Sequence, residues 1–284
     1  MNENLQPPVP TINTWIADAT AQLKDAQIDS ARLDGELLLA HTLKKPRTYL
    51  HAHGDDPLTL RMQEIADSRL LLRLDRVPLA YIIGHKEFFG RNFKVTPATL
   101  IPRPESEDII HILKEQMPKS VALLPSGKRL IDVGTGSGCL GITAKLELPE
   151  LDVTLLDIST HALNVAEENA QALHANITTI RSDLLQSYPF TPAFILANLP
   201  YVDPDWELSP ELQHEPALAL FAAENGLSLI RKLIEQSSEL LQQTGILLLE
   251  ADARQHDAII TIAKSHGFRL VETRGLILHF EHYG

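Results

Sequence analysis

The sequence predicts an α/β protein in which a mostly parallel, seven-stranded sheet with an antiparallel edge strand follows a small all-α domain and a β-hairpin linker. Apolar residues recur at helical spacing in the first 80 residues, aromatic and β-branched residues flank Gly90, and short apolar strands alternate with helical stretches from about residue 107 onward. Such alternation implies right-handed crossovers between parallel strands, with helices on both faces of the sheet. The predicted divisions are residues 1–80, 81–106 and 107–284.

Composition narrows the class of protein before any motif is considered. The chain has 284 residues, 44% of them hydrophobic and 22% charged, which is typical of an ordinary globular protein. Its 25 Lys and Arg residues against 37 Asp and Glu residues give a net charge of -12, which disfavours a protein that holds nucleic acid through its phosphates. We therefore expect no direct nucleic-acid partner.

The expected location of the protein is the cytoplasm. Its only cysteine, Cys139, cannot form an intramolecular disulfide, which fits a reducing compartment. The N-terminal stretch MNENLQPPVP lacks the basic and apolar regions of a signal peptide, and no apolar run approaches the ~20 residues needed to cross a bilayer. We expect no membrane partner, and a monomer as the default state.

The first domain is predicted to be a helical bundle. Its helices are TINTWIADATAQL, with Thr11 as the N-cap, then SARLDGELLLAHTL and LTLRMQEIADSRLLLRL. In the second of these, Asp34 and Glu36 lie near the positive N-terminal end of the helix dipole. A bundle of this kind is expected to serve packing or partner docking rather than chemistry of its own.

The rest of the chain is predicted to be a joint followed by the sheet. A β-hairpin around Gly90 leads into a connector stiffened by Pro97, Pro102 and Pro104. The strands that follow are RLIDVG, DVTLLD, TTIRSD, FILAN, GILLLEA, FRLVETRG and LILHFEHYG. The last two are joined too tightly for a helical crossover, so they predict the antiparallel edge.

A glycine-rich loop follows the first strand of the predicted sheet and opens a helix. The stretch LIDVGTGSGCLG places glycines at positions 134, 136 and 138, where they allow a tight turn and a close approach of the backbone to a ligand. The dinucleotide fingerprint would need a glycine at position 139, which is cysteine, and no Lys-Ser or Lys-Thr pair follows as in a P-loop. The loop therefore predicts a bound ligand other than a dinucleotide.

Two acids at strand ends fit such a ligand. Asp157 ends the second strand about 20 residues beyond the loop, where doubly wound folds hold an acid that accepts hydrogen bonds from ribose hydroxyls. Together with the loop, it predicts a nucleoside-type ligand. Asp183, at the end of the third strand, would accept from the exocyclic amine of a purine while Leu184 packs on the ring. A helix cap or a surface-turn acid explains Asp183 equally well.

The fourth strand, FILAN, ends in a side-chain amide. Asn198 should lie beside the end of the first strand, at the mouth of the crevice where such sheets bind ligands. Leu199, Pro200 and Tyr201 come next, and six prolines between residues 189 and 216 predict a long, stiffened loop. This tetrad is expected to face whatever the nucleoside carries.

These motifs resemble those of the class I S-adenosylmethionine-dependent methyltransferases that modify planar NH2 groups, which have a Rossmann-like fold and usually an Asn-Pro-Pro-Tyr tetrad. The motifs are the loop D-x-G-T-G-S-G at 132–138, Asp157 and the tetrad at 198–201. More narrowly, PLAYIIGHKEFFG, TPATLIPRPESE, ANLPYVD and HEPALALFAAENGL are similar, in order and spacing, to the protein-glutamine methyltransferases of class-1 peptide chain release factors. The helical front also resembles that family, so the resemblance covers nearly the whole chain.

The resemblance implies a cofactor, a protein substrate and the residues that bind them. The cofactor is S-adenosylmethionine, converted to S-adenosylhomocysteine, and the substrate is the glutamine of a Gly-Gly-Gln tripeptide in a class-1 release factor. The implied cofactor-binding residues are Asp132, Gly134, Thr135, Gly136, Ser137, Gly138, Asp157, Asp183, Leu184 and Asn198. The implied substrate-binding residues are Pro102, Arg103, Pro104, Glu215 and Pro216, together with the tetrad, which is also the catalytic set. A rigid joint in which Arg103 and Glu215 merely pair is an equal alternative for Pro102, Arg103, Pro104, Glu215 and Pro216.

The chemistry of amide methylation fits this tetrad. An amide nitrogen is a poor nucleophile because its lone pair is delocalised, so positioning must do most of the work. The side-chain oxygen of Asn198 and the backbone carbonyl of Leu199 would hold both N–H bonds of the substrate amide, an orientation worth about 7 to 11 kcal/mol of barrier. Tyr201 would pack against the flat amide. Leu199 replaces the family's proline but keeps the carbonyl, and Pro200 keeps it extended, so we expect activity to survive.

Two other functions remain open at this point. A nucleic-acid adenine-amino methyltransferase would also present a planar NH2 group to the tetrad, but the acidic charge and the lack of a basic target-reading domain argue against it. An inactive binding module would keep the cofactor pocket and use the helical domain as an interaction surface, and only Leu199 favours it. The histidines at 51–53 and 279–284 form no convincing ligand set, so we expect no metal.

Overall fold

The computed structural model describes residues 9–120 and 128–283. Residues 1–8, on which the expectation of an unexported protein partly rests, lie outside the described residues. No helix within the described ranges is long and apolar enough to span a bilayer. The chain divides into two compact units. The helical unit comprises Met1–Gly84 and Pro210–His214, and the sheet unit comprises His85–Ser209 and Glu215–Gly284.

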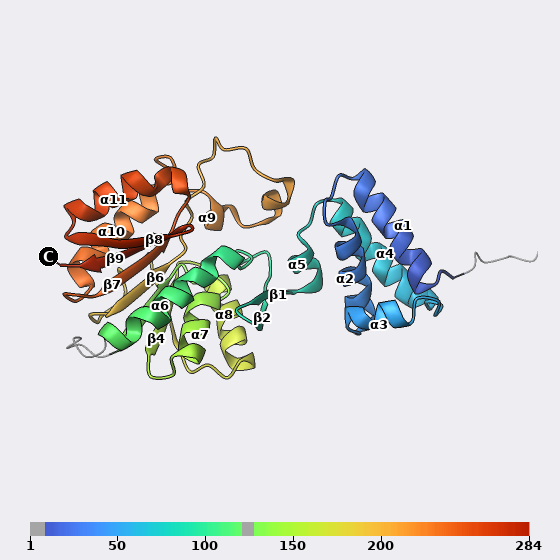
Figure 1. Cartoon of the computed structure of the whole chain (residues 1–284), viewed down its shortest axis with the longest axis horizontal. Helices are drawn as coiled ribbons and strands as arrows, with labels where there is room; N and C mark the ends of the chain where they lie inside the picture. The colour runs from blue at the N-terminus through green and yellow to red at the C-terminus, as the bar shows by residue number, and fades with distance from the viewer. Residues whose placement is uncertain (1–8, 121–127, 284) are drawn as a thin grey trace, which may run out of the picture. The chain divides into compact units, whose positions relative to one another are not determined.

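The helical unit contains the predicted bundle and two short helices that the sequence patterns did not indicate. Its elements are α1 (Ile12–Asp25), α2 (Ala31–Leu43), α3 (Arg47–Ala52), α4 (Leu60–Leu74), α5 (Leu79–Ile83) and the 3-10 helix η2 (Pro210–His214) (Figure 1). Thr11 caps α1 as predicted, because its hydroxyl accepts the backbone N–H of Thr14 at 3.3 Å. The core of this unit is formed by apolar side chains of α1, α2 and α4.

Two acids of α2 are buried rather than placed at the surface near the helix dipole. Asp34 is 4% exposed and accepts a hydrogen bond from Arg73 Nε at 2.7 Å. Glu36 is also buried and accepts from Arg32 at 3.0 Å and from Arg47 at 2.6 Å. The negative charges of these two acids are therefore balanced by arginines, and not only by the helix dipole that the sequence indicated.

The sheet unit is built on a seven-stranded sheet in the order β5-β4-β3-β6-β7-β9-β8. The strands are β3 (Arg129–Val133), β4 (Asp152–Asp157), β5 (Thr178–Arg181), β6 (Phe194–Ala197), β7 (Ile246–Glu250), β8 (Phe268–Arg274) and β9 (Ile277–His282). The predicted mostly parallel sheet is confirmed, and β9 is the strand that runs antiparallel to both of its neighbours. It lies between β7 and β8 because its side chains are nearly all buried, whereas those of β8 alternate as an edge strand requires.

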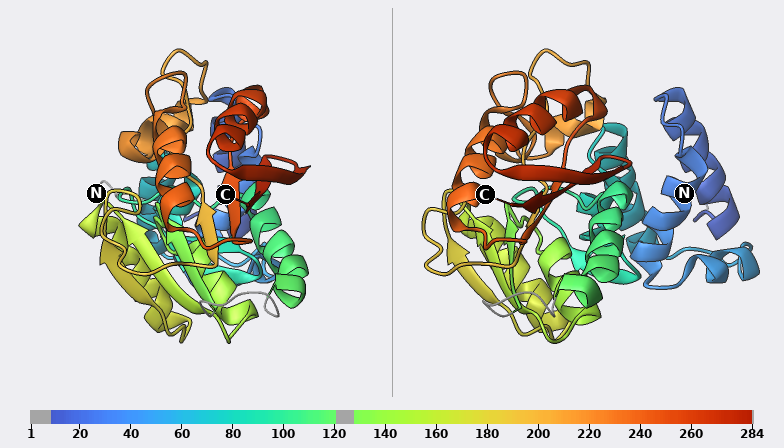
Figure 2. Two further views of the ribbon diagram at one scale, coloured as in Figure 1. Left: turned by 90° about the vertical axis from the view of Figure 1, so that its left-hand side faces the viewer. Right: turned by 60° about the vertical axis from the view of Figure 1, so that its left-hand side comes forward.

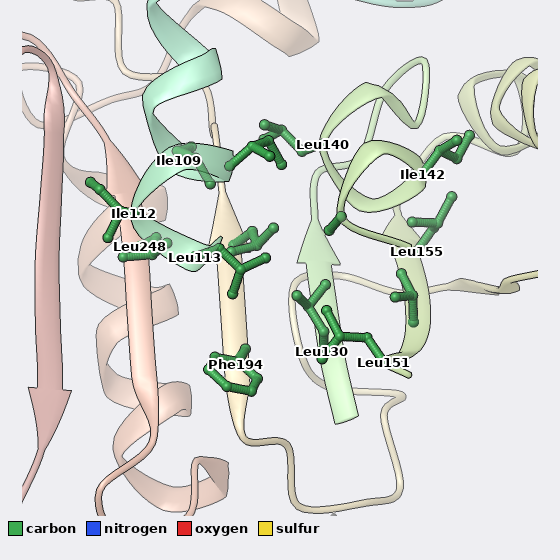
Figure 3. Close-up of a cluster of buried hydrophobic side chains, with 14 of the residues drawn as sticks. Ile109, Ile112, Leu113, Leu130, Leu140, Ile142, Leu151, Leu155, Phe194 and Leu248 are labelled. Carbon is green, nitrogen blue, oxygen red and sulfur yellow. The ribbon is translucent and has the colours of Figure 1, made fainter. Parts of the chain in front are cut away.

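Helices cover both faces of this sheet (Figures 1 and 2). One face packs against α6 (Glu107–Ser120), α7 (Cys139–Glu147) and α8 (Thr160–Ala172), and the other against α10 (Ser228–Leu240) and α11 (His256–Ser265). Successive strand residues serve opposite faces, so that Leu130 and Ile131 belong to different cores. Figure 3 shows the first core, in which Ile109, Ile112 and Leu113 of α6 pack close to Leu248. The short helices of the unit are η1 (Pro104–Ser106), α9 (Ala217–Leu220) and η3 (Ala253–Gln255).

The predicted β-hairpin is present and belongs to the sheet unit. Its strands are β1 (His85–Phe88) and β2 (Arg91–Lys94), and both turn residues, Phe89 and Gly90, have positive φ, as a tight two-residue turn requires. Asn169 of α8 attaches it: the side-chain oxygen accepts the N–H of Lys94 at 2.7 Å, and the side-chain nitrogen donates to the carbonyls of Lys94 and Ser137. The hairpin is thereby held to the glycine-rich loop.

Candidate active site

A cavity of about 300 Å³ opens where three parallel strands end. Val133 of β3 pairs with Leu156 of β4 and with Ala197 of β6, so the residues that follow these strands lie side by side. The cavity is formed entirely within the sheet unit. The predicted site residues that line it are Pro102, Arg103, Gly134, Thr135, Gly136, Ser137, Asp157, Asp183, Leu184, Asn198, Leu199, Pro200 and Pro216. Its volume suits a small-molecule ligand, since such sites begin at about 300 Å³.

The glycine-rich loop is held from beneath by Asp132. One carboxylate oxygen accepts from the Thr135 hydroxyl at 2.5 Å and from the Gly141 N–H at 2.9 Å. Burial raises the pKa of Asp132 to about 6, although both hydrogen bonds favour the charged form. Asp132 and Gly138 do not line the cavity, so they shape the loop and do not contact a ligand in the cavity directly.

The loop leaves room for a ligand at its centre. Gly134, Gly136 and Gly138 all adopt positive φ, a conformation that L side chains rarely take. A Cβ atom built on Gly136 would meet nothing within 4 Å, so the backbone there faces open space beside the cavity. Open space beside a helix N-terminus fits an extended polar ligand whose oxygens or charged groups approach the backbone.

Asp157 presents a carboxylate of fixed orientation to the cavity. Its two oxygens accept the backbone N–H groups of Gly136 at 3.0 Å and of Ser159 at 2.8 Å. Burial raises the pKa of this carboxyl. Each oxygen retains a further lone pair, which suits the two hydroxyls of a ribose.

Asp183 and Leu184 line the cavity at the end of β5. Asp183 pairs with Lys232 at 2.6 Å, so its carboxylate partner is a cation and not the helix N–H of the capping alternative. Leu184 is buried, lines the cavity and has a φ of 51°, which turns the chain immediately after Asp183.

The tetrad divides between the cavity and the core. Asn198, Leu199 and Pro200 line the cavity, and the Asn198 side-chain nitrogen donates to the Ser106 hydroxyl at 3.1 Å. Tyr201 does not line it; its ring packs against the apolar core, and its hydroxyl faces Glu250 at 3.4 Å.

Leu199 occupies the space beside Gly134, where an added Cβ would lie 2.9 Å from its Cδ2 atom. The leucine that replaces proline is thus accommodated by a glycine of the loop.

The predicted substrate-side residues also divide. Pro102, Arg103 and Pro216 line the cavity, whereas Pro104 and Glu215 do not. Glu215 is buried and accepts from Arg103 at 2.5 Å and from the N–H of Ile101 at 3.1 Å. The pair foreseen in the rigid-joint alternative therefore exists, and it fixes the connector beside the cavity.

Several residues that support the tetrad were not predicted. The side-chain nitrogen of Gln255 donates to the carbonyls of Tyr201 and Asn225, each at 2.8 Å. A Cβ atom on Gly226 would lie only 1.9 Å from the Tyr201 carbonyl oxygen, so glycine is required there. Glu250, at the end of β7, faces both Tyr201 and Ser106. The signal for Glu250 was present, because it is an acid at the end of an apolar strand, as Asp157 is.

Comparison with known proteins identifies the family. Residues 14–84 match the PrmC N-terminal domain family, and residues 110–215 match the methyltransferase small domain family. A release factor glutamine methyltransferase of Koribacter versatilis is 38% identical over 245 residues, covering 84% of this chain and 86% of that protein. The enzyme of the same name from Salmonella typhimurium is 35% identical, covering 91% of this chain and 92% of that protein.

A solved structure shares the fold of the sheet at much lower identity. The N-terminal domain of human METTL16, solved in complex with SAH, has a TM-score of 0.51 and 16% identity, covering 87% of this chain and 94% of that one. This likeness shows a methyltransferase fold, whereas the relatives above share both sequence and length with the chain. The chain belongs to the release factor glutamine methyltransferase family.

Proposed function

We propose that this enzyme transfers a methyl group from S-adenosylmethionine to the side-chain amide nitrogen of the glutamine in the Gly-Gly-Gln tripeptide of class-1 peptide chain release factors. The observation that carries the proposal is the orientation of Asn198. Its side-chain nitrogen is bonded to Ser106, which leaves the side-chain oxygen as an acceptor beside the cavity. An acceptor at this place is what a substrate NH2 group requires.

The residues around the cavity fit S-adenosylmethionine. The open backbone at Gly136 would receive its amino-acid portion, the two oxygens of Asp157 its ribose hydroxyls, and Asp183 with Leu184 its adenine. When bound, the cofactor supplies an electrophilic methyl group on a sulfonium. Asp157 has its carboxylate already fixed by two backbone N–H groups, so little ordering is needed on binding.

The tetrad would orient the substrate amide. The side-chain oxygen of Asn198 and the carbonyl of Leu199 accept its two N–H bonds, and this fixes the plane of the amide and the direction of its lone pair. Tyr201 lies outside the cavity, and we assign it the support of the tetrad backbone from the core side. The amide proton leaves after methyl transfer, when the nitrogen has become strongly acidic.

We assign the finer features of the enzyme in the same way. The helical unit would receive the release factor, and the connector residues Pro102 and Arg103, with Pro216, would border the path of the substrate. The enzyme would act in the cytoplasm as a monomer, without a metal and without direct contact with nucleic acid.

Peptide mass spectrometry tests the proposal. The purified protein is incubated with labelled S-adenosylmethionine and a matched release factor, with and without Gln→Ala in the tripeptide. Label on that glutamine, absent from the altered factor and absent when the enzyme carries Asn198→Ala, is the expected result. Cofactor binding without label on the factor would favour the inactive binding module, and label on DNA adenine would favour the nucleic-acid enzyme.

A further inference from the structure

Behind Asn198 lies a short chain of buried hydrogen bonds. Asn198 donates from its side-chain nitrogen to the Ser106 hydroxyl at 3.1 Å, and Ser106 donates to a carboxylate oxygen of Glu250 at 2.5 Å. Ser106 closes η1 and is 2% exposed, and Glu250 ends β7 and is 1% exposed. Burial raises the pKa of Glu250, and the hydrogen bonds from Ser106, Tyr201 and Asn198 oppose that rise by favouring its ionised form.

When Glu250 is ionised, the number of protons in this chain fixes its direction. A serine hydroxyl carries a single hydrogen, and an ionised carboxylate can only accept. Once Ser106 donates to Glu250, its oxygen can only accept from Asn198. The amide of Asn198 must therefore turn its NH2 group toward Ser106, which directs its oxygen the opposite way.

We propose that Ser106 and Glu250 are positioning residues that set the hydrogen-bond polarity of Asn198, so that the amide presents an acceptor to the substrate nitrogen. This inference rests on the proposed function. With the amide reversed, two NH2 groups would face each other and the substrate would not be held. Asn and Gln side chains are nearly symmetric in shape, so shape alone cannot prevent the reversal.

The surroundings of Glu250 fit this role. Glu250 forms no ion pair within residues 9–120 and 128–283, and the titratable groups that act on it there include Tyr201, Glu105 and Cys139, none of which is a cation. A buried carboxylate without a cationic partner is costly, and an apolar residue would suit a purely structural position better. The cost is explained if an obligate acceptor is needed at this point.

Two single variants at position 250 test whether the hydrogen-bond acceptor or the volume of the side chain matters. Glu250→Met keeps the volume but removes the acceptor, so the Ser106 hydroxyl becomes free to donate to the Asn198 oxygen and hold the amide reversed. We expect kcat to fall by about 100-fold, the loss typical of a misplaced catalytic group, with the KM for S-adenosylmethionine nearly unchanged. Glu250→Gln can offer Ser106 either its amide oxygen or its NH2 group, so we expect its kcat to lie between those of the wild type and Glu250→Met.

The double variant is decisive. Ser106→Ala in the Glu250→Met background removes the misdirecting hydroxyl, so we expect kcat to rise above that of Glu250→Met alone. If both residues served stability only, the double variant would be the less active of the two. Ser237→Ala is the matched control, because Ser237 lies buried in α10 and its hydroxyl has no hydrogen-bond partner among the described residues. We expect it to retain wild-type kcat.

Two arms keep the outcomes distinct. If wild-type enzyme does not label the glutamine, the proposed function fails. If it does label it, and Glu250→Met keeps wild-type kcat or the double variant is slower, only this inference fails.

Should Glu250→Met not fold, the pH profile of Glu250→Gln replaces it. Protonated Glu250 could donate to Ser106 and reverse the chain, so the wild type should lose kcat at acid pH and the Gln variant should not. Identical acid limbs would overturn the inference.

Discussion

The buried acids of the helical unit differ in their partners from Asp132 and Glu250 of the sheet unit, whereas Glu215 of the sheet unit pairs with Arg103, as the helical acids pair with arginines. In the helical unit, Asp34 and Glu36 face arginines, and the hydrogen bonds of Arg47 and Arg32 outweigh burial and hold the pKa of Glu36 below its ordinary value. In the sheet unit, Asp132 and Glu250 face hydroxyl, amide and backbone N–H groups, and burial raises the pKa of both.

This difference separates a structural use of charge from a functional one. Arginine partners neutralise the acids of the helical unit, which therefore serve to join helices. Asp132 and Glu250 lie behind the glycine loop and the tetrad, where they hold donors in fixed directions. A cation there would make the acid more stable but would compete for the hydrogen bonds that orient the site.

Removing an arginine from the helical unit should have the largest effect on stability. Arg73→Met leaves Asp34 buried without its partner, since both side chains are less than a tenth exposed. We expect the free energy of unfolding to fall by about 3 to 5 kcal/mol, measured by urea denaturation. Arg269→Met, which breaks an exposed pair with Glu281, should cost at most about 1 kcal/mol. Equal losses in the two variants would remove the basis of the comparison.

Neutralising an acid of the sheet unit should stabilise the protein at alkaline pH. The folded pKa of Asp132, about 6, exceeds its ordinary value of 3.8, so its contribution to stability is complete below about 3.8 and is lost as the pH rises through 6. Asp132→Asn avoids that loss and should be more stable than the wild type at pH 8 by up to about 3 kcal/mol. Thermal unfolding between pH 4 and 8 checks this, because the gap should widen up to about pH 6 and stay constant above it. A gap that is constant over the whole of this range would contradict the assignment.

Removing an uncharged helix N-cap should lower stability by the same amount in the two units. Thr11 and Ser159 accept the N–H groups of Thr14 at 3.3 Å and of Ala162 at 3.2 Å, at the starts of α1 and α8. Thr11→Ala and Ser159→Ala should each cost about 1 kcal/mol in urea denaturation. A much larger loss in one unit would mean that the units differ in general stability and not in how they treat charge.

The prediction at Cys139 concerns the reactivity of its thiol and requires no change in stability. Burial, and then the nearby charge of Asp132, raise the pKa of its thiol to about 12 from an ordinary 9.0. The thiolate is then about 1000-fold scarcer at a given pH than in an unfolded chain. Iodoacetamide at pH 8 should therefore alkylate the native protein at least about 100-fold more slowly than the urea-unfolded protein. Comparable rates would show that the sheet unit does not suppress ionisation at this site.

Local patterns predicted most of the sheet unit. The strand-helix alternation predicted all seven strands, and the rule that ligands bind beyond strand ends predicted that Gly134, Asp157 and Asn198 lie at one site. The helices α6 and α11 were not predicted. In α6 the consecutive apolar residues Ile109 and Ile110 widen the buried face and blur its helical period.

Hydrogen-bond and ion-pair partners that lie far apart in the sequence could not be predicted from local patterns. Ser106 lies 92 residues from Asn198 and 144 residues from Glu250, so no spacing connects them. The same holds for the buried acids of α2, because Asp34 meets Arg73 across 39 residues. Sequence periodicity identifies which side chains face inward, but the partner of a buried charge depends on how separate elements pack.

The assignment of η2 to the helical unit has a consequence for dissecting the enzyme. The chain passes from one unit to the other at Gly84–His85, returns at Ser209–Pro210 and leaves again at His214–Glu215. Glu211, in the returning segment, is bonded to both Arg73 and Arg76. A truncation that begins at His85 would therefore keep Pro210–His214 but remove the helices that this segment belongs with. The retained segment directly precedes Glu215, which is bonded to the connector. The helical unit is therefore built from two segments that lie far apart in the sequence, and an N-terminal cut alone does not remove all of it.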